Sequence, residues 1–296
     1  MDVDFVRNWA SPEITQTYAV KDTILYGLSM GYGADPLDMS QLAFVYENGL
    51  KAVPTMATTL CHPGFWISEP QTGINANMVV HGEHLMRFHA PLPPSGTVRG
   101  TTRVTDIIDK GKEKGAIVLT EREIIEDASG KLIATIEQAT MCRGDGGFSG
   151  SAPSSGKPAT AQPASSAPDE QYDIPTLPQS ALLYRLCADP NPLHADPKIA
   201  AAAGFDRPIL HGLCTYGIAA RAILQLCCGN NPDRLARLSV RFTAPVFPGE
   251  TIRTEIWRDD DQVRFRCSIP QRDVVVITNG MAEIGAVVAE DATLGI

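Results

Sequence analysis

Residues 189–194, which read Asp-Pro-Asn-Pro-Leu-His, are the densest cluster of side chains suited to acid–base chemistry. A carboxylate, an amide and an imidazole lie within six residues, and such groups can hold a water molecule and move its protons. The two prolines restrict φ, so a rigid segment can aim all three side chains at one point. The same spacing also fits an Asx-type turn with a capping Asp189 and a surface His194, and the spacing alone does not separate the two interpretations.

A second candidate feature is the pair His211-Gly212, which begins an apolar, helix-like stretch. The first N–H groups of a helix have no acceptor within the helix, and they lie at the positive end of its dipole. Because glycine lets an oxygen approach the backbone closely, the N–H of Gly212 is a candidate oxyanion-hole donor. The alternative is an ordinary helix start with a packed His211.

The elements expected to position these groups include one long helix over residues 212–228. That stretch is apolar around most of its circumference, which is typical of a helix wrapped by a sheet. A short helix is predicted from Pro197 to just before Gly204. A similar helix is predicted to begin at Pro36 and to end before Gly49.

Several runs rich in β-branched residues predict strands separated by turn signals, as in antiparallel meanders. These predicted strands are residues 101–108, 116–125, 132–141, 251–258, 263–269 and 274–278. Together with the helices they indicate an α+β fold.

The chain divides near its middle. Residues 144–170 are rich in Gly, Ser, Ala and Pro and predict a linker between an N-terminal half, residues 1–143, and a C-terminal half, residues 171–296. Residues 86–98 resemble residues 240–252 at an offset of 154, and a second match lies at an offset of 158. Two matches in nearly one register indicate an internal duplication.

The two halves differ after their His-Gly pairs. A full helix separates His211-Gly212 from Arg241, whereas His81-Gly82 and Arg87 are almost adjacent. If the pairs are equivalent, the first half has lost its central helix at this point. The volume that this helix would have filled is then empty, filled by another segment, or used for a ligand.

Composition excludes several functional classes. The net charge of −9 and the 6% aromatic content argue against nucleic-acid binding, which requires a basic surface and stacking side chains. No apolar run approaches the ~18 residues of a membrane helix, and the N-terminus lacks the pattern of a signal peptide. Seven cysteines without a CxxC pair predict reduced thiols. With no Ser-Lys-Leu at residues 294–296, we expect a cytoplasmic protein more than a peroxisomal one.

Other active-site types fit less well. Gly31-Tyr32-Gly33 lacks the third glycine of a dinucleotide fingerprint, and no G-x-S-x-G elbow is present. The histidines that might form a metal site do not have the spacing of a standard ligand set, so no metal is expected. These histidines are His62, His81, His84 and His89.

Residues 184–194 and 203–217 together resemble the hydratase 2 signature of the MaoC-like dehydratases and (R)-specific enoyl-CoA hydratases. The likeness extends from about residue 10 to 290, in the duplicated form also found as the hydratase part of peroxisomal multifunctional enzyme type 2. Further similar segments are residues 45–47, 60–63, 81–83, 91–93, 109–111 and 143–148.

This resemblance implies a double hot-dog fold, in which two sheets merge into one and each wraps a helix. It implies reversible hydration of a trans-2-enoyl-CoA to a (3R)-3-hydroxyacyl-CoA, without a cofactor beyond the coenzyme A of the substrate. Asp189 and His194 match the catalytic pair, of which one partner takes a proton and the other delivers one. Asn191 matches the residue that positions the water, and the Gly212 N–H matches the donor to the thioester oxygen.

The resemblance also implies a set of substrate contacts. They are His81, Gly82, Lys110, Pro190, Pro192, Leu193 and Phe242. Arg143 and Arg241 are weaker candidates for phosphate contacts. Because the whole chain is acidic, binding of the polyanionic coenzyme A must depend on local cations such as Lys110, Lys112 and Lys114. Hot-dog sheets commonly pair, so a homodimer is expected, with an acyl-CoA thioester as the substrate partner.

The chain departs from the family signature at two positions. Cys187-Ala188 stands where the family usually has Ser-Gly, and Pro190 removes one N–H. Neither change deletes a catalytic group, so activity is expected to survive.

Only the second half carries the catalytic motif, so we expect one active site per chain, with the first half holding a medium, long or bulky acyl chain. The alternatives are a non-catalytic acyl-CoA binder and a hot-dog thioesterase.

Overall fold

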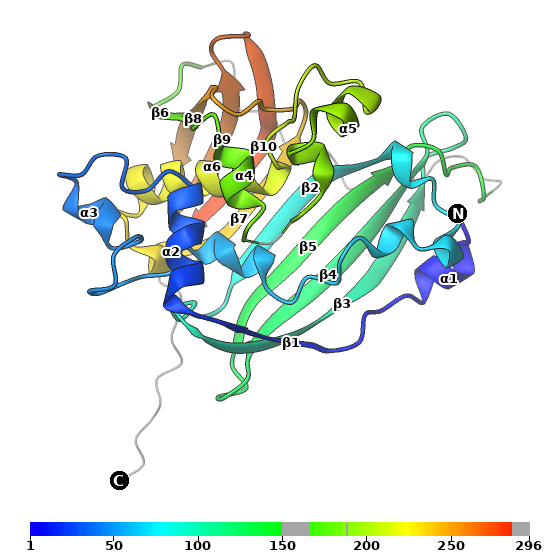
Figure 1. The fold of residues 1–296 in the computed structure, drawn as a ribbon, viewed down its shortest axis with the longest axis horizontal. Helices are drawn as coiled ribbons and strands as arrows, with labels where there is room; N and C mark the ends of the chain where they lie inside the picture. Colours follow the sequence, from blue (N-terminus) through cyan, green and yellow to red (C-terminus); the bar gives the residue numbers. More distant parts are fainter. Residues whose placement is uncertain (150–165, 188, 286–296) are drawn as a thin grey trace.

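The computed structural model describes residues 1–149, 166–187 and 189–285, and its centre is a ten-stranded antiparallel sheet (Figure 1). The first half contributes β1 (Ile14–Tyr18), β2 (Val79–Phe88), β3 (Gly96–Asp109), β4 (Ala116–Glu126) and β5 (Leu132–Cys142). The second half contributes β6 (Glu170–Pro175), β7 (Leu235–Phe242), β8 (Thr251–Asp259), β9 (Gln262–Ile269) and β10 (Val274–Ile284). Each strand predicted from the sequence lies within one of these elements.

The order of strands repeats in reverse across the centre of the sheet. The order is β1-β3-β4-β5-β2 followed by β7-β10-β9-β8-β6, so that β2 and β7 pair where the halves meet. Leu85 of β2 lies directly opposite Ser239 of β7, and their numbers differ by the offset of 154 found in the sequence. The α+β double hot-dog fold, with the two sheets merged into one, is confirmed.

The helices of the described residues are mostly short. They are α1 (Val3–Arg7), α2 (Val20–Ser29), α3 (Met39–Leu42), α4 (Ser180–Tyr184), α5 (Pro197–Ala202) and α6 (Gly212–Cys227). The predictions of α5 and α6 are confirmed, and Asp196 caps α5 by accepting from the Lys198 N–H at 2.8 Å.

The predicted helix between Pro36 and Gly49 is wrong in extent, because α3 covers only Met39–Leu42. Asp35 does not cap a helix; its carboxylate accepts from the Leu37 N–H at 2.9 Å and holds a turn. Asp38 is the actual cap and accepts from the Ser40 N–H at 3.0 Å. Two capping-type residues lie close together here, and the later one starts the helix.

Helix α6 is the core of the second half and is held partly by the first half. It lies against β6, β7 and β8, and most of its residues are buried. The buried Arg221 donates from Nη1 to the Met30 carbonyl at 3.2 Å and from Nη2 to Gln41 Oε1 at 3.0 Å. Gly31 has φ of +83°, and a Cβ there would lie 2.7 Å from Arg221 Nη1. Gly31 therefore lets the Arg221 guanidinium lie directly against the backbone.

The first half has no long helix among its described residues. The chain instead crosses the face of β3, β4 and β5 as short 3-10 turns (Figure 1). These turns are η1 (Pro54–Thr59), η2 (Trp66–Ser68), η3 (Pro70–Thr72) and η4 (Ala76–Met78). His81-Gly82 lies within β2, whereas His211-Gly212 begins α6, so the two pairs are not equivalent positions. These 3-10 turns therefore partly fill the place that a long helix would occupy in the first half.

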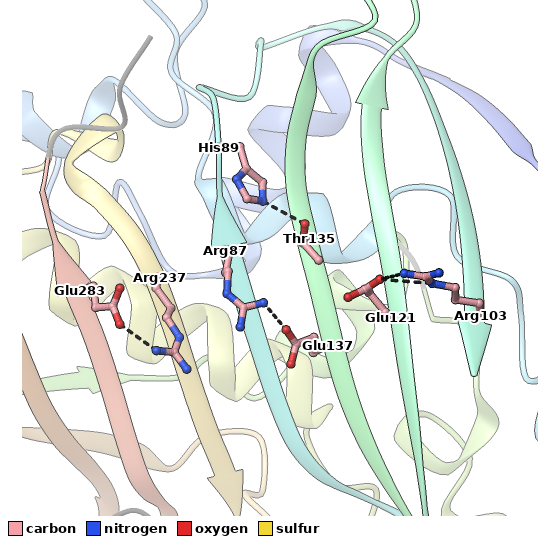
Figure 2. Close-up of polar contacts among 8 residues, drawn as sticks. All are labelled: Arg87, His89, Arg103, Glu121, Thr135, Glu137, Arg237 and Glu283. Carbon is pink, nitrogen blue, oxygen red and sulfur yellow. Dashed lines mark hydrogen bonds and ion pairs between the residues drawn. The ribbon is translucent and has the colours of Figure 1, made fainter. Parts of the chain in front are cut away.

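The outer face of the sheet carries cross-strand ion pairs on both sides of the junction between the halves (Figure 2). Arg87 of β2 pairs with Glu137 of β5, and Arg237 of β7 pairs with Glu283 of β10. Arg87 and Arg237 lie opposite each other in register, so each arginine is neutralised from its far side. The side chains suited to catalysis lie on the other, inner face.

The start of the predicted linker is anchored. The Asp109 carboxylate accepts from the N–H groups of Gly147 and Ser149 at 2.8 and 2.7 Å. Residues 150–165 lie outside the described residues, and β6 begins at Glu170.

All seven cysteines are free thiols, as predicted. Within the described ranges, no helix is long and apolar enough to cross a membrane.

Candidate active site

The motif at residues 189–194 forms a tight polar turn between α4 and α5. Asp189 accepts from the Asn191 N–H through Oδ1 at 3.0 Å, and Asn191 Oδ1 accepts from the Leu193 N–H at 3.0 Å. The second bond caps the 3-10 turn η5 (Pro192–His194). The Asx-type turn weighed from the sequence is therefore present, but its second feature is wrong, because His194 is only 8% exposed.

The tautomer of His194 follows from its backbone partner. Nδ1–H donates to the carbonyl oxygen of Ile209 at 2.8 Å, so Nε2 of the neutral ring carries a lone pair. Burial lowers the pKa of His194 below its usual value, while the bond to Ile209 and the Asp189 carboxylate oppose that shift. His194 is thus held as a neutral base with Nε2 available.

His211 holds both members of the predicted catalytic pair. Its Nε2–H donates to the main-chain carbonyl oxygen of Asp189 at 3.1 Å. Its ring stacks on that of His194, with centroids 3.7 Å apart and an interplanar angle of 27°. Burial, with a smaller contribution from His194, lowers the pKa of His211 to about 3. The ring therefore stays neutral, and the sequence reading of a merely packed histidine misses this contact.

Gly212 is the first residue of α6, so its N–H has no acceptor within the helix. The Phe242 ring lies against it, since a Cβ built on Gly212 would be 3.6 Å from that ring. His81 packs edge-on against the same ring, with centroids 5.0 Å apart. The structure therefore brings the predicted oxyanion donor together with two predicted substrate contacts, Phe242 of the same half and His81 of the first half.

A β-bulge in β2 determines the direction of His81. The pairing with β5 shifts between His81 and Glu83, which leaves Gly82 as the extra residue. In a regular strand, residues three apart point to opposite faces. Here the rings of His81 and His84 meet edge-on at 5.1 Å, so both lie on the inner face. Burial lowers the pKa of His81 to about 4 and that of His84 well below its usual value.

The predicted cations are farther from this centre. Lys110 follows β3, which lies three strands from β2, or roughly 14 Å at about 4.8 Å per strand. Lys112 and Lys114 are exposed in the adjoining turn, and the exposed Arg143 follows β5 at the same end of the sheet. Arg241 lies on the outer face and pairs with Glu83 at 3.0 Å, so it does not face the site.

The remaining motif residues line the outside of the turn, where Pro190 and Pro192 are exposed and Leu193 is half-buried. Ala188, the departure from the family signature, lies outside the described residues. Cys187 lies beside Ser29, with Sγ and Oγ 3.8 Å apart.

Asp189, His194 and His211 form a group with the donor types of a metal site, and their ligand atoms lie within 4.8 Å of one another. Two zinc–ligand bonds of about 2.1 Å span at most about 4.2 Å, so three ligands at the wider spacing must move before they share an ion. The four histidines weighed from the sequence do not converge, because His89 bonds to Thr135 on the outer face (Figure 2).

The sequence reading missed Arg122 and considered His84 only as a possible metal ligand; both lie on the inner face of the first half. Arg122 of β4 is 5% exposed and donates from Nη2 to the Thr58 carbonyl oxygen at 2.6 Å. Thr58 Oγ1 also bonds to His84 Nε2 at 3.2 Å. The available signal was a charged residue at an inward position of an alternating strand, which the run at residues 116–125 contains.

Comparison with protein-family models gives one match to each half. Residues 16–144 match a model described as the MFE-2 hydratase 2 N-terminal domain. Residues 159–280 match a model described as a MaoC like domain.

Similar proteins extend along nearly the whole chain. Enoyl-CoA hydratase ChsH3 of Mycobacterium tuberculosis is 36% identical over 97% of this chain and 99% of its own length. The peroxisomal enoyl-CoA hydratase 2 of Arabidopsis thaliana is 36% identical over 90% of each chain. The crystal structure of a MaoC-like dehydratase from Phytophthora capsici superposes with a TM-score of 0.81 at 31% identity, covering 97% of this chain and 99% of that one.

Proposed function

This chain belongs to the MaoC-like dehydratase family and is a lyase of the hydratase/dehydratase type; we propose that it reversibly hydrates trans-2-enoyl-CoA to (3R)-3-hydroxyacyl-CoA. The supporting observation is that a carboxylate oxygen of Asp189 and a ring nitrogen of His194 lie within 4.8 Å of each other. A single water molecule can bridge two groups at that separation.

His194 is the base in the proposed mechanism. Its Nε2 lone pair takes a proton from water while the water oxygen adds to the β-carbon of the enoyl group. The Asp189 carboxylate orients the water and stabilises the imidazolium that forms. The imidazolium then delivers a proton to the α-carbon from the same face, which gives syn addition and returns His194 to its neutral form. Asn191 supports this geometry by capping the turn that carries both side chains.

The Gly212 N–H stabilises the electron density that moves to the thioester oxygen. It is placed at the positive end of a sixteen-residue helix, so the dipole of α6 adds to the single hydrogen bond. The edge-on packing of His81 and Phe242 beside it excludes water from the thioester. No cofactor has a step in this scheme.

Coenzyme A is proposed to extend from Gly212 toward the basic end of the sheet. Lys110, Lys112, Lys114 and Arg143 gather there, and β2 begins at that end two residues before His81. Local cations of this kind can bind the phosphates in spite of the net charge of −9.

A medium, long or bulky acyl chain is proposed to occupy the first half. A cavity of about 250 Å³ borders η1 at Met56 and Thr59 and reaches Cys187, two residues before Asp189. Its wall also includes Tyr26, Leu60 and Leu186, together with the polar residues Gln16, Thr17 and Asp22. A length series of enoyl-CoA substrates tests this, since turnover that collapses beyond about six carbons would contradict it.

A homodimer and a cytoplasmic location stay predictions. Light scattering after size-exclusion chromatography measures the first, and imaging of the tagged full chain in its own cell measures the second.

Turnover of crotonyl-CoA tests the proposed reaction directly. We expect loss of absorbance from the conjugated thioester and formation of the (3R) product, scored with a stereospecific dehydrogenase. Release of free coenzyme A would instead indicate the thioesterase alternative. Tight binding without turnover would indicate the non-catalytic binder.

A further inference from the structure

A cation is buried in the first half without an anionic partner among the described residues. Arg122 lies on the inner face of β4, and its Nε has no hydrogen-bond partner. The described carboxylates form no ion pair with it, in contrast to the arginines of the outer face, such as Arg103, which pairs with Glu121. A buried charge is costly unless it is paired, so this guanidinium is suited to a ligand that brings a negative group.

Arg122 is connected to the proposed catalytic centre by a chain of contacts. Thr58 accepts from Arg122 through its carbonyl and bonds to His84 through its hydroxyl. The ring of His84 then meets that of His81, which packs on the Phe242 ring beside Gly212. These contacts connect the Gly212 N–H, the proposed donor to the thioester, with the Arg122 guanidinium in the first half.

Unpartnered polar atoms gather along this path. Of the eleven buried side-chain polar atoms without a partner in the described part of the chain, five surround the centre. They are His81 Nε2, His84 Nδ1, Arg122 Nε, Tyr184 Oη and His211 Nδ1. Buried polar groups normally have partners, so a cluster of them indicates a site that accepts a polar ligand group. The inner face of the first half therefore presents polar groups as well as apolar side chains.

Space adjoins this cluster. The cavity of about 250 Å³ is lined by Thr59, which follows Thr58 in η1, and by Met56, two residues before Thr58. It also reaches Tyr26, whose ring lies 6.2 Å from that of Tyr184. An acyl chain in this cavity would contact Thr59 and Tyr26, the neighbours of Thr58 and Tyr184.

We propose that Arg122, His84 and Tyr184 form a subsite for a second oxygen group on the acyl chain, with a carboxylate as the best match. The substrate class is then an enoyl-CoA whose chain carries a carboxylate distant from the thioester. Arg122 binds its charge, and the Tyr184 hydroxyl donates to it. This inference rests on the proposed hydratase function.

The test compares trans-2-enedioyl-CoA half-thioesters with plain trans-2-enoyl-CoA of the same carbon number, over a series of lengths. For at least one length we expect kcat/KM to favour the carboxylate chain by roughly 10-fold or more, the effect of one charge-assisted hydrogen bond. In Arg122→Met the ratio should fall to near one, whereas in Arg103→Met, which changes a surface arginine, it should stay as in the wild type. If Arg122→Met does not fold, Tyr184→Phe keeps the ring and should lower the same ratio.

Two results would overturn the subsite: equal turnover of both chains at every length, or a preference that neither Arg122→Met nor Tyr184→Phe changes. A matched chain that ends in a hydroxyl separates charge from hydrogen bonding, and its preference over the carboxylate would overturn the assignment to an anion. Plain-chain turnover by the wild type distinguishes the two hypotheses. Its absence removes the proposed function, whereas its presence without any preference removes only the subsite.

Discussion

The Nε2–H of His211 donates to the main-chain carbonyl oxygen of Asp189, and the same ring stacks on His194. The neutral His211 side chain thus holds the backbone of Asp189 in place and fixes the plane of the His194 ring. The residue after it, Gly212, supplies the proposed thioester contact. All three chemical groups are therefore positioned by the first turn of α6.

Replacing either member of the proposed catalytic pair should lower turnover without unfolding the chain. We expect His194→Ala to reduce crotonyl-CoA hydration at least ~100-fold, the usual contribution of a general acid or base. Asp189→Asn should reduce it by a similar factor, because it removes the charge that stabilises the imidazolium. His89→Ala is the matched control, because His89 is exposed on the outer face (Figure 2). Near-wild-type rates in well-folded Asp189 and His194 variants would remove the assignment.

Gly212→Pro should delete the proposed oxyanion donor while leaving the helix in place. Proline is favoured at the first helical position, and His211 already has the extended ψ of 136° that precedes a proline. We expect kcat to fall about 10²–10³-fold, as when one oxyanion donor is lost. Circular dichroism checks the fold, and a fully active Gly212→Pro variant would show that this N–H has no role.

His211 should act as a positioning residue that a suitable amide can replace. His211→Phe keeps a ring beside His194 but loses the bond to Asp189, and kcat should fall roughly 10-fold, the value of one hydrogen bond. His211→Gln can restore the donor, so it should recover part of kcat with KM unchanged. Equal losses in both variants would indicate a packing role instead.

Acid should destabilise the chain between pH 6.5 and about 4. Burial lowers the folded-state pKa of His81 to about 4 and that of His84 well below 6.5, so in this window the unfolded chain binds more protons than the folded one. The stability that these two neutral histidines contribute is therefore fully present above pH 6.5 and is lost as the pH falls. Urea midpoints measured across the window check the sign. His84→Gln should remove up to about one proton, or about 1.4 kcal/mol per pH unit, from the slope.

Gly217→Ala should destabilise the contact between α2 and α6. A Cβ on Gly217 would lie 2.1 Å from the Met30 sulfur and 3.0 Å from the Tyr26 hydroxyl. Both neighbours are fully buried, so overpacking should cost about 1–3 kcal/mol in the free energy of unfolding. Gly212→Ala, in the same helix, would meet only ordinary contacts at 3.6 Å and is the stability control. Equal urea midpoints for the two variants would contradict the packing argument.

Local signals account for the parts of the fold that the sequence predicts well. The apolar stretch at residues 212–228, the Asp196-Pro197 start of α5 and the alternating runs correspond to elements whose type depends on neighbouring residues. The near-constant offset predicts the internal duplication, which corresponds to the mirrored strand order of the two halves.

Long-range contacts explain the rest. His194 looks like a surface residue in its own segment, but it bonds to the Ile209 carbonyl and stacks on the ring of His211, and both come from a later segment of the chain. His81 and His84 share a face because of a bulge, which no periodicity of two predicts. Arg122 belongs to a regular strand, and its significance depends on Thr58, 64 residues away.

The central pairing of Leu85 with Ser239 places the pseudo-two-fold axis inside one polypeptide. In an assembly of two identical chains, every substitution appears on both sides of such an axis at once. Here a substitution changes one side only, so the half that carries Asp189 and the half that carries Arg122 can be altered independently. With the roles proposed for these residues, reaction chemistry and substrate choice can thus be changed separately, one half at a time.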